Sequence, residues 1–248
     1  MREATFELWR GDKDGGRFES YTTMVSGGMV VLDAVKQIQA EHANDLAVRW
    51  NCKAGKCGSC SAEINGRPRL MCMTRMSALP AGETIMVQPM KAFPLIRDLV
   101  TDVSWNYRVK KTIKPFTPRP PDNEDGSWNM AQEDADRVME FRKCVECFLC
   151  QDVCHVLREH QLYDEFVGPR FMVYVAALEM HPLDTANRLD DLRKAHGIGY
   201  CNITKCCTTV CPEDITITDN AIIPLKERVV DHAYDPLGRL IRALTGDA

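Results

Sequence analysis

Eleven of the twelve cysteines in this chain fall into three short groups. Thiolates are soft metal ligands, and cysteines a few residues apart can present their sulfurs to one metal centre. The spacing therefore predicts binding of metal ions or metal clusters. The groups are Cys52, Cys57, Cys60 and Cys72; then Cys144, Cys147, Cys150 and Cys154; then Cys201, Cys207 and Cys211.

The first group predicts a [2Fe-2S] cluster. It reads C-x4-C-x2-C with Cys72 further along the chain, which is the plant-type spacing. Gly55 and Gly58 permit the backbone to approach a cluster closely. Backbone N–H groups, with Lys53 and Lys56, would stabilise the added electron. A zinc site is the alternative, although zinc usually takes two C-x2-C pairs.

The second group predicts a [4Fe-4S] cluster. It reads C-x2-C-x2-C-x3-C, the bacterial run whose fourth cysteine binds a different cluster. We expect a tight helical loop that presents Cys144, Cys147 and Cys150 to one cluster face. The fourth ligand is predicted to be Cys211, because a proline follows it as in the bacterial motif.

Cys154 is then left for a third cluster, together with Cys201 and Cys207. A full [4Fe-4S] motif would need a further cysteine at position 204, where this chain has threonine. Because a neutral hydroxyl is a poor iron ligand beside thiolates, we expect a [3Fe-4S] cluster with three protein ligands. Cys206 is out of register and is interpreted as a buried, inert thiol. As the neighbour of Cys207 it remains an alternative ligand.

The elements expected around the first group form a small mixed sheet with one helix. Alternating apolar residues predict a hairpin of strands at residues 5–10 and 17–25, and helical spacing predicts a helix over residues 30–39. Asn65-Gly66 predicts a tight turn. Further strands are expected at residues 46–50, 61–64, 70–73 and 84–87.

Prolines separate this sheet from a helical second half. Four prolines between residues 111 and 125 prevent both helix and central strand. The predicted organisation is an α+β chain with a plant-type [2Fe-2S] domain at residues 1–104, a linker or strap at 105–130 and a helical domain at 131–248. Its helices are expected at residues 132–142, 169–180, 185–196 and 224–244.

Composition excludes several functions. A net charge of −4 gives no basic footprint for nucleic acid. Twelve cysteines in 248 residues fall below the roughly 8–10% of a disulfide scaffold, so we expect reduced thiolates. The first ten residues carry no export or organelle signal. No apolar run reaches the roughly 18 residues of a membrane span, so membrane contact is expected through partner subunits.

The three cysteine groups and the Cys211-Pro212 ending resemble the iron–sulfur subunit of succinate dehydrogenase and fumarate reductase, over essentially the whole chain. Residues 94–102 resemble that family's inter-domain junction. The resemblance implies a β-grasp ferredoxin domain followed by a helical bacterial-ferredoxin-like domain. It also implies two kinds of partner: a flavoprotein subunit with covalent FAD and the dicarboxylate site, and transmembrane anchor subunits with a quinone site.

In that arrangement the [2Fe-2S] cluster receives electrons from the flavin, the [4Fe-4S] cluster relays them and the [3Fe-4S] cluster delivers them to quinone. The chain itself then has no catalytic residue. The expected location is the cytoplasmic face of the bacterial plasma membrane, with the chain as a peripheral subunit. A fumarate reductase running in reverse, a soluble complex serving a thiol-linked fumarate reductase, and a structural zinc-binding module are the alternatives.

Two residues near the third group depart from the family pattern. His155 follows Cys154 where proline is usual, and Asn202 stands where many ubiquinone-reducing members have histidine. An altered quinone pocket, suited to menaquinone, and drift at a subunit contact explain this equally well. His155 is a candidate to hydrogen-bond a quinone or a cluster sulfur, although such a histidine is more often a structural partner.

Overall fold

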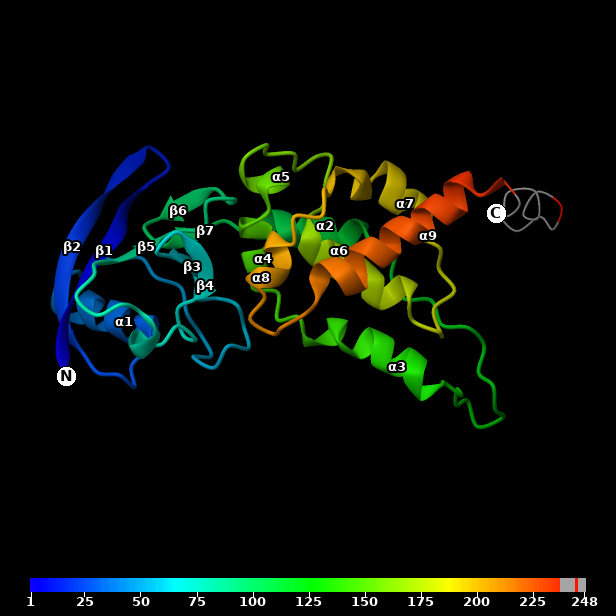
Figure 1. Cartoon of the computed structure of the whole chain (residues 1–248), viewed down its shortest axis with the longest axis horizontal. Helices are drawn as coiled ribbons and strands as arrows, with labels where there is room; N and C mark the ends of the chain where they lie inside the picture. The colour runs from blue at the N-terminus through cyan, green and yellow to red at the C-terminus, as the bar shows by residue number, and fades with distance from the viewer. Residues whose placement is uncertain (237–243, 245–248) are drawn as a thin grey trace.

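The computed structural model describes residues 1–236 and 244. The chain forms a sheet with one covering helix at its N-terminal end and a set of helices at its C-terminal end, arranged along the long axis of the molecule (Figure 1). This is the α+β arrangement expected from the sequence.

The N-terminal sheet is mixed. Its order is β4-β3-β5-β1-β6-β7, and β2 pairs with β1. β1 runs antiparallel to β2 and parallel to β5. Alternate residues of β1, such as Phe6 and Leu8, are buried, as the period of a one-sided strand requires. The strands are β1 (Arg2–Asp12), β2 (Gly15–Val25), β3 (Ser61–Ile64), β4 (Arg67–Leu70), β5 (Ile85–Gln88), β6 (Leu95–Arg97) and β7 (Val100–Thr101).

Helix α1 (Val31–Glu41) covers this sheet and contacts β2. Its buried side chains recur at helical spacing, because one face of the helix meets the sheet. They join the core that also holds Cys60 and Cys72. The buried residues of α1 are Val31, Leu32, Ala34, Val35 and Ile38.

The hairpin of β3 and β4 positions part of the first cysteine group. Asn65 and Gly66 have φ of 50° and 74°, the positive values that a type I′ turn requires. Because this turn has two residues, β4 starts directly at Arg67. The strand predicted at residues 70–73 therefore lies three residues earlier.

Residues 46–50 are not a strand, so that prediction is wrong. The Ala47 N–H donates to the buried carboxylate of Asp98 at 2.8 Å, and the Leu99 N–H donates to the Ala47 carbonyl at 3.2 Å. These bonds satisfy the backbone without a ladder. An apolar run alone does not distinguish this conformation from a strand.

The second half is helical, as predicted. Pro169 and Pro224 lie in the first turns of α6 and α9, where their missing N–H costs nothing. A π-helical segment, Ile217–Ile222, leads into α9. The helices are α2 (Ser104–Thr112), α3 (Gln132–Met139), α4 (Leu149–Asp152), α5 (His155–Arg158), α6 (Pro169–Glu179), α7 (Leu189–Lys194), α8 (Cys206–Thr209) and α9 (Ile223–Tyr234).

Three helix predictions differ from the structure. The one for 132–142 ends at Met139 and continues as a 3-10 turn, and the one for 185–196 narrows to α7. Residues 237–243 of the helix predicted over 224–244 lie outside the described residues. Sequence analysis missed α2, which occupies the start of the predicted linker.

The rest of the linker is held against the helical part by Arg188. This side chain is fully buried and donates to the carbonyls of Lys114 and Pro115 at 2.9 and 2.8 Å. It also pairs with the buried Asp184 at 2.8 Å. The proline-rich segment is thus fixed at its start. No helix in the described part of the chain is long and apolar enough to span a membrane.

Candidate cluster sites

The first cysteine group lies on a loop whose backbone turns toward sulfur. Lys53, Gly55 and Gly58 have positive φ values of 56°, 69° and 66°. The N–H groups of Ala54 and Lys56 point at Cys52 Sγ, at 3.4 and 3.3 Å. Such N–H groups stabilise negative charge on sulfur, whether of a thiolate or of a cluster.

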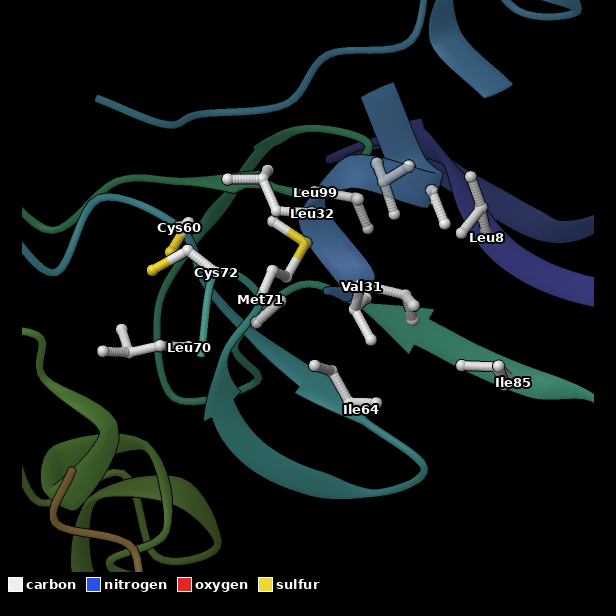
Figure 2. Close-up of a cluster of buried hydrophobic side chains, with 14 of the residues drawn as sticks. Leu8, Val31, Leu32, Cys60, Ile64, Leu70, Met71, Cys72, Ile85 and Leu99 are labelled. Atoms are coloured by element: carbon white, nitrogen blue, oxygen red, sulfur yellow. The ribbon is translucent and has the colours of Figure 1, made fainter. Parts of the chain in front are cut away.

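Cys60 and Cys72 close the first group from the two ends of the β3–β4 hairpin. The Met71 N–H donates to the Cys60 carbonyl at 3.1 Å, and both thiols lie together at the edge of the apolar core (Figure 2). Burial and the neighbouring Cys72 raise the pKa of Cys60 to about 12. Burial also acts on Cys57, but hydrogen bonds from Ser59 and from Cys52 outweigh it and lower the Cys57 pKa to about 7.

The second and third groups share one local conformation. A 3-10 turn precedes the first cysteine of each, Phe141–Lys143 before Cys144 and Ile198–Tyr200 before Cys201. The second and fourth residues after that cysteine have positive φ, and a short helix then begins, α4 or α8. The positive-φ residues are Glu146 and Phe148 in one group and Ile203 and Lys205 in the other.

This shared conformation gives a residue-by-residue correspondence. Cys147 corresponds to Thr204 and Cys150 to Cys207, while Cys206 corresponds to the buried Leu149. Thr204 therefore holds the place of a cysteine. The helical loop predicted for the second group is wrong, because left-handed residues alternate along it and α4 begins only at Leu149.

Four thiols of the second group surround one cavity. Cys144, Cys147, Cys150 and Cys211 line it together with apolar Val145, Phe148 and Ile215. The thiols of Cys144 and Cys211 also interact electrostatically with those of Cys147 and Cys150. Four soft donors around an apolar space fit the ligand set of a [4Fe-4S] cluster.

The third group brings four thiols together rather than three. Cys154 interacts electrostatically with Cys206 and Cys207, and Cys207 interacts with Cys206 and Cys201. Cys206 is only partly buried and accepts a hydrogen bond from Thr204 Oγ1 at 3.2 Å. The prediction of a buried Cys206 is therefore wrong, and the choice of ligands at this site stays a prediction.

Burial dominates the acidity of the thiols in both C-terminal groups. It raises the pKa of Cys147 and of Cys154 to about 12 and that of Cys207 to about 11. A metal ligand must lose this proton, so metal binding supplies the free energy that ionises a buried thiol. Among residues 1–236 and 244, no group of three or more His, Cys, Asp or Glu side chains is placed to hold a single metal ion.

His155 and Asn202 both lie beside the third group. His155 is the first residue of α5 and is half-buried, with its ring 6.2 Å from that of His160. Asn202 directly follows Cys201 and is exposed. Their positions leave the quinone role of both residues a prediction.

Sequence analysis missed the contacts that join the two halves of the chain. Glu63 on β3 is fully buried and pairs with Arg158 of α5 at 2.6 Å. Lys56 Nζ lies 3.0 Å from the carboxylate of Glu213, two residues after Cys211. No sequence signal pairs residues so distant, and a glutamate within a short strand gives no sign that it is buried.

Comparison with known proteins supports both parts of the chain. Residues 5–107 match the model of a 2Fe-2S iron-sulfur cluster binding domain, and residues 140–215 match that of a 4Fe-4S dicluster domain. These matches confirm the predicted fold, a ferredoxin domain followed by a domain for two clusters.

Full-length relatives carry the same pair of domains. The fumarate reductase iron-sulfur subunit of Mycobacterium tuberculosis is 33% identical over 205 residues, covering 80% of each chain. The succinate dehydrogenase iron-sulfur subunit of Paracoccus denitrificans is 28% identical over 232 residues, covering 91% of this chain and 88% of the relative. Three longer relatives differ, because the chain spans only 41%, 42% and 45% of their lengths.

A solved structure is closer still. A chain of the Mycobacterium smegmatis Sdh1 complex in the apo form has a TM-score of 0.90 and 58% identity, over 95% of this chain and 98% of that one. Homologues of this kind are subunits of an oxidoreductase complex. The chain belongs to the family of iron–sulfur subunits of succinate dehydrogenases and fumarate reductases.

Proposed function

We propose that this chain is the electron-transfer subunit of a succinate:quinone oxidoreductase. Its cysteines would bind three centres, which carry one electron at a time when present. The ligands are Cys52, Cys57, Cys60 and Cys72 for [2Fe-2S], Cys144, Cys147, Cys150 and Cys211 for [4Fe-4S], and Cys154, Cys201 and Cys207 for [3Fe-4S].

The observation that carries this proposal is the contact between successive thiol groups. Ser61 Oγ, next to Cys60, lies 2.8 Å from the Cys147 carbonyl, so the first group meets the second. Cys150 of the second group interacts electrostatically with Cys207 of the third. The groups thus follow one another in the order that a one-electron relay needs, without a gap filled by other parts of the chain.

The remaining parts of the reaction belong to partner subunits. Electrons would enter from FAD of a flavoprotein subunit and leave to a quinone at transmembrane anchors, with this chain bound at the cytoplasmic face of the plasma membrane. We propose menaquinone as the acceptor, because His155 and Asn202 replace residues usual in ubiquinone-reducing members. The residues of this chain hold the centres and set their potentials through burial and N–H···S bonds.

Fumarate reduction by the same route in reverse is the second candidate, and one relative carries that name. A soluble thiol-linked complex is less well supported, because the chain spans most of the two shorter relatives and under half of the longer ones. The zinc-module alternative predicts a colourless protein.

The test is reduction of the purified complex by succinate. We expect the iron–sulfur absorbance to bleach on addition of succinate and to recover on addition of a menaquinone analogue. Faster fumarate reduction than succinate oxidation would assign the reverse direction. Stoichiometric zinc with no succinate-dependent bleaching would contradict the proposal.

A further inference from the structure

We propose that Gly58 and Ser61 are positioning residues for electron transfer between the first and second cluster sites. They would hold the two cysteine loops in direct contact, so that the centres lie as close as the backbone allows. This inference rests on the proposed function, because it identifies the junction through which that transfer would pass.

Gly58 lies against the backbone of Cys147. A Cβ atom at position 58 would be 2.5 Å from Cys147 Cα and 2.9 Å from its backbone nitrogen. These are backbone atoms, so no side-chain rotation relieves the overlap. Position 58 therefore requires glycine for its neighbour as well as for its φ of 66°.

The same contact brings the proposed ligands together. Gly58 directly follows Cys57 in the chain, and it touches Cys147 itself. A cavity of about 70 Å³ beside the contact is lined by both cysteines. One glycine residue thus separates a ligand of the first site from a ligand of the second.

Ser61 joins the two loops by hydrogen bonding. Its Oγ lies 2.8 Å from the Gly58 carbonyl and 2.8 Å from the Cys147 carbonyl. A hydroxyl has one hydrogen, so it donates to one of these carbonyls at a time. Either choice keeps the hydroxyl between the loops, where it prevents their separation without adding bulk.

Two further contacts close the junction at its edges. Lys56 pairs with Glu213 at 3.0 Å, and Arg67 donates to the Thr209 carbonyl at 2.7 Å. Each links the first cysteine group or its hairpin to the segment around Cys211. The approach of Gly58 to Cys147 is therefore supported on both sides of the loop.

Replacing Gly58 by alanine should separate the two loops. The 2.5 Å approach must grow by about 0.9 Å before it reaches ordinary van der Waals contact at 3.4 Å. Electron tunnelling falls steeply with distance, and the magnetic interaction between two paramagnetic centres falls with the cube of their separation. Both should decrease in the variant.

Gly66 offers a matched control. Its φ is 74°, and no atom lies within 4 Å of the position that a Cβ would take. Gly58→Ala and Gly66→Ala therefore place an alanine in similarly strained backbone, and only the first collides with Cys147. A difference between the two variants reports the contact and not the strain.

The experiment uses the intact complex with full iron content. Freeze-quench EPR after mixing with succinate gives the rate at which the second centre is reduced once the first is. Spin-relaxation measurements on dithionite-reduced complex give the interaction between the two centres. For Gly58→Ala we expect several-fold slower transfer and a weaker interaction, with Gly66→Ala equal to wild type. Wild-type values for Gly58→Ala would overturn the inference.

Ser61→Ala decides the case in which Gly58→Ala does not assemble its first cluster. It removes the bridging hydroxyl and introduces no collision, so a weaker interaction supports the inference and an unchanged one refutes it. Wild-type complex that succinate does not reduce would refute the proposed function instead. The dithionite measurement would then still test the contact, because it needs no substrate.

Discussion

Replacing Thr204 by cysteine is expected to add one iron to the third site. Thr204 corresponds to Cys147 in the conformation that the two C-terminal groups share, and Thr204 Oγ1 lies 3.2 Å from Cys206 Sγ within the third thiol group. A thiol in its place completes a four-cysteine set of the kind that holds a [4Fe-4S] cluster.

The size of the effect follows from the ligand count. Three sites with four, four and three thiolates predict about nine irons per chain, and Thr204→Cys raises this to about ten. An oxidised three-iron centre is paramagnetic, whereas a four-iron centre in its usual oxidised state is not. The EPR signal of the air-oxidised complex should therefore disappear in the variant, while total iron increases.

Thr209→Cys is the control for this experiment. Thr209 is exposed on the same short helix, and its Oγ1 donates to the Cys206 carbonyl at 2.8 Å. It adds a thiol to the segment but not in the register of the motif, so iron content and EPR signal should remain those of wild type. Unchanged iron and an unchanged signal in Thr204→Cys would refute the reasoning.

Three further predictions follow. Cys206→Ser should keep the three-iron signal, whereas Cys207→Ser should lose it; the reverse result would exchange their roles. Arg188→Met should lower the free energy of unfolding by about 3–5 kcal/mol, because it leaves buried carboxylates and carbonyls unpaired, against less than about 1 kcal/mol for the surface pair of Arg193; denaturant titration of the holoprotein compares them. Removal of iron by chelation should speed hydrogen exchange across residues 144–215 more than in the N-terminal sheet, which has its own core; uniform exchange would contradict this.

Local signals predicted the sheet well where they were strong. The Asn65-Gly66 turn and the alternation in β1 each require one conformation, and both occur in the structure. The apolar run at residues 46–50 was ambiguous, and the hydrogen bond that settles it comes from Asp98, far along the chain. Such pairing depends on tertiary contacts that no local pattern reports.

The cysteine groups show the same division. Their spacing predicted which thiols meet, including the long-range pairing of Cys211 with the second group. Their backbone was not predictable, because Glu146 and Phe148 adopt left-handed φ values that such residues rarely take. The contact of Gly58 with Cys147 was also invisible, since the sequence shows a glycine but not its neighbour.

EPR spectroscopy of the intact complex, with iron and zinc analysis of the same sample, tests the central claim most directly. The account predicts about nine irons per chain, a three-iron signal in the oxidised state and a [2Fe-2S] signal that appears on addition of succinate. A zinc-loaded sample without these signals, or an oxidised complex with no three-iron signal, would contradict it.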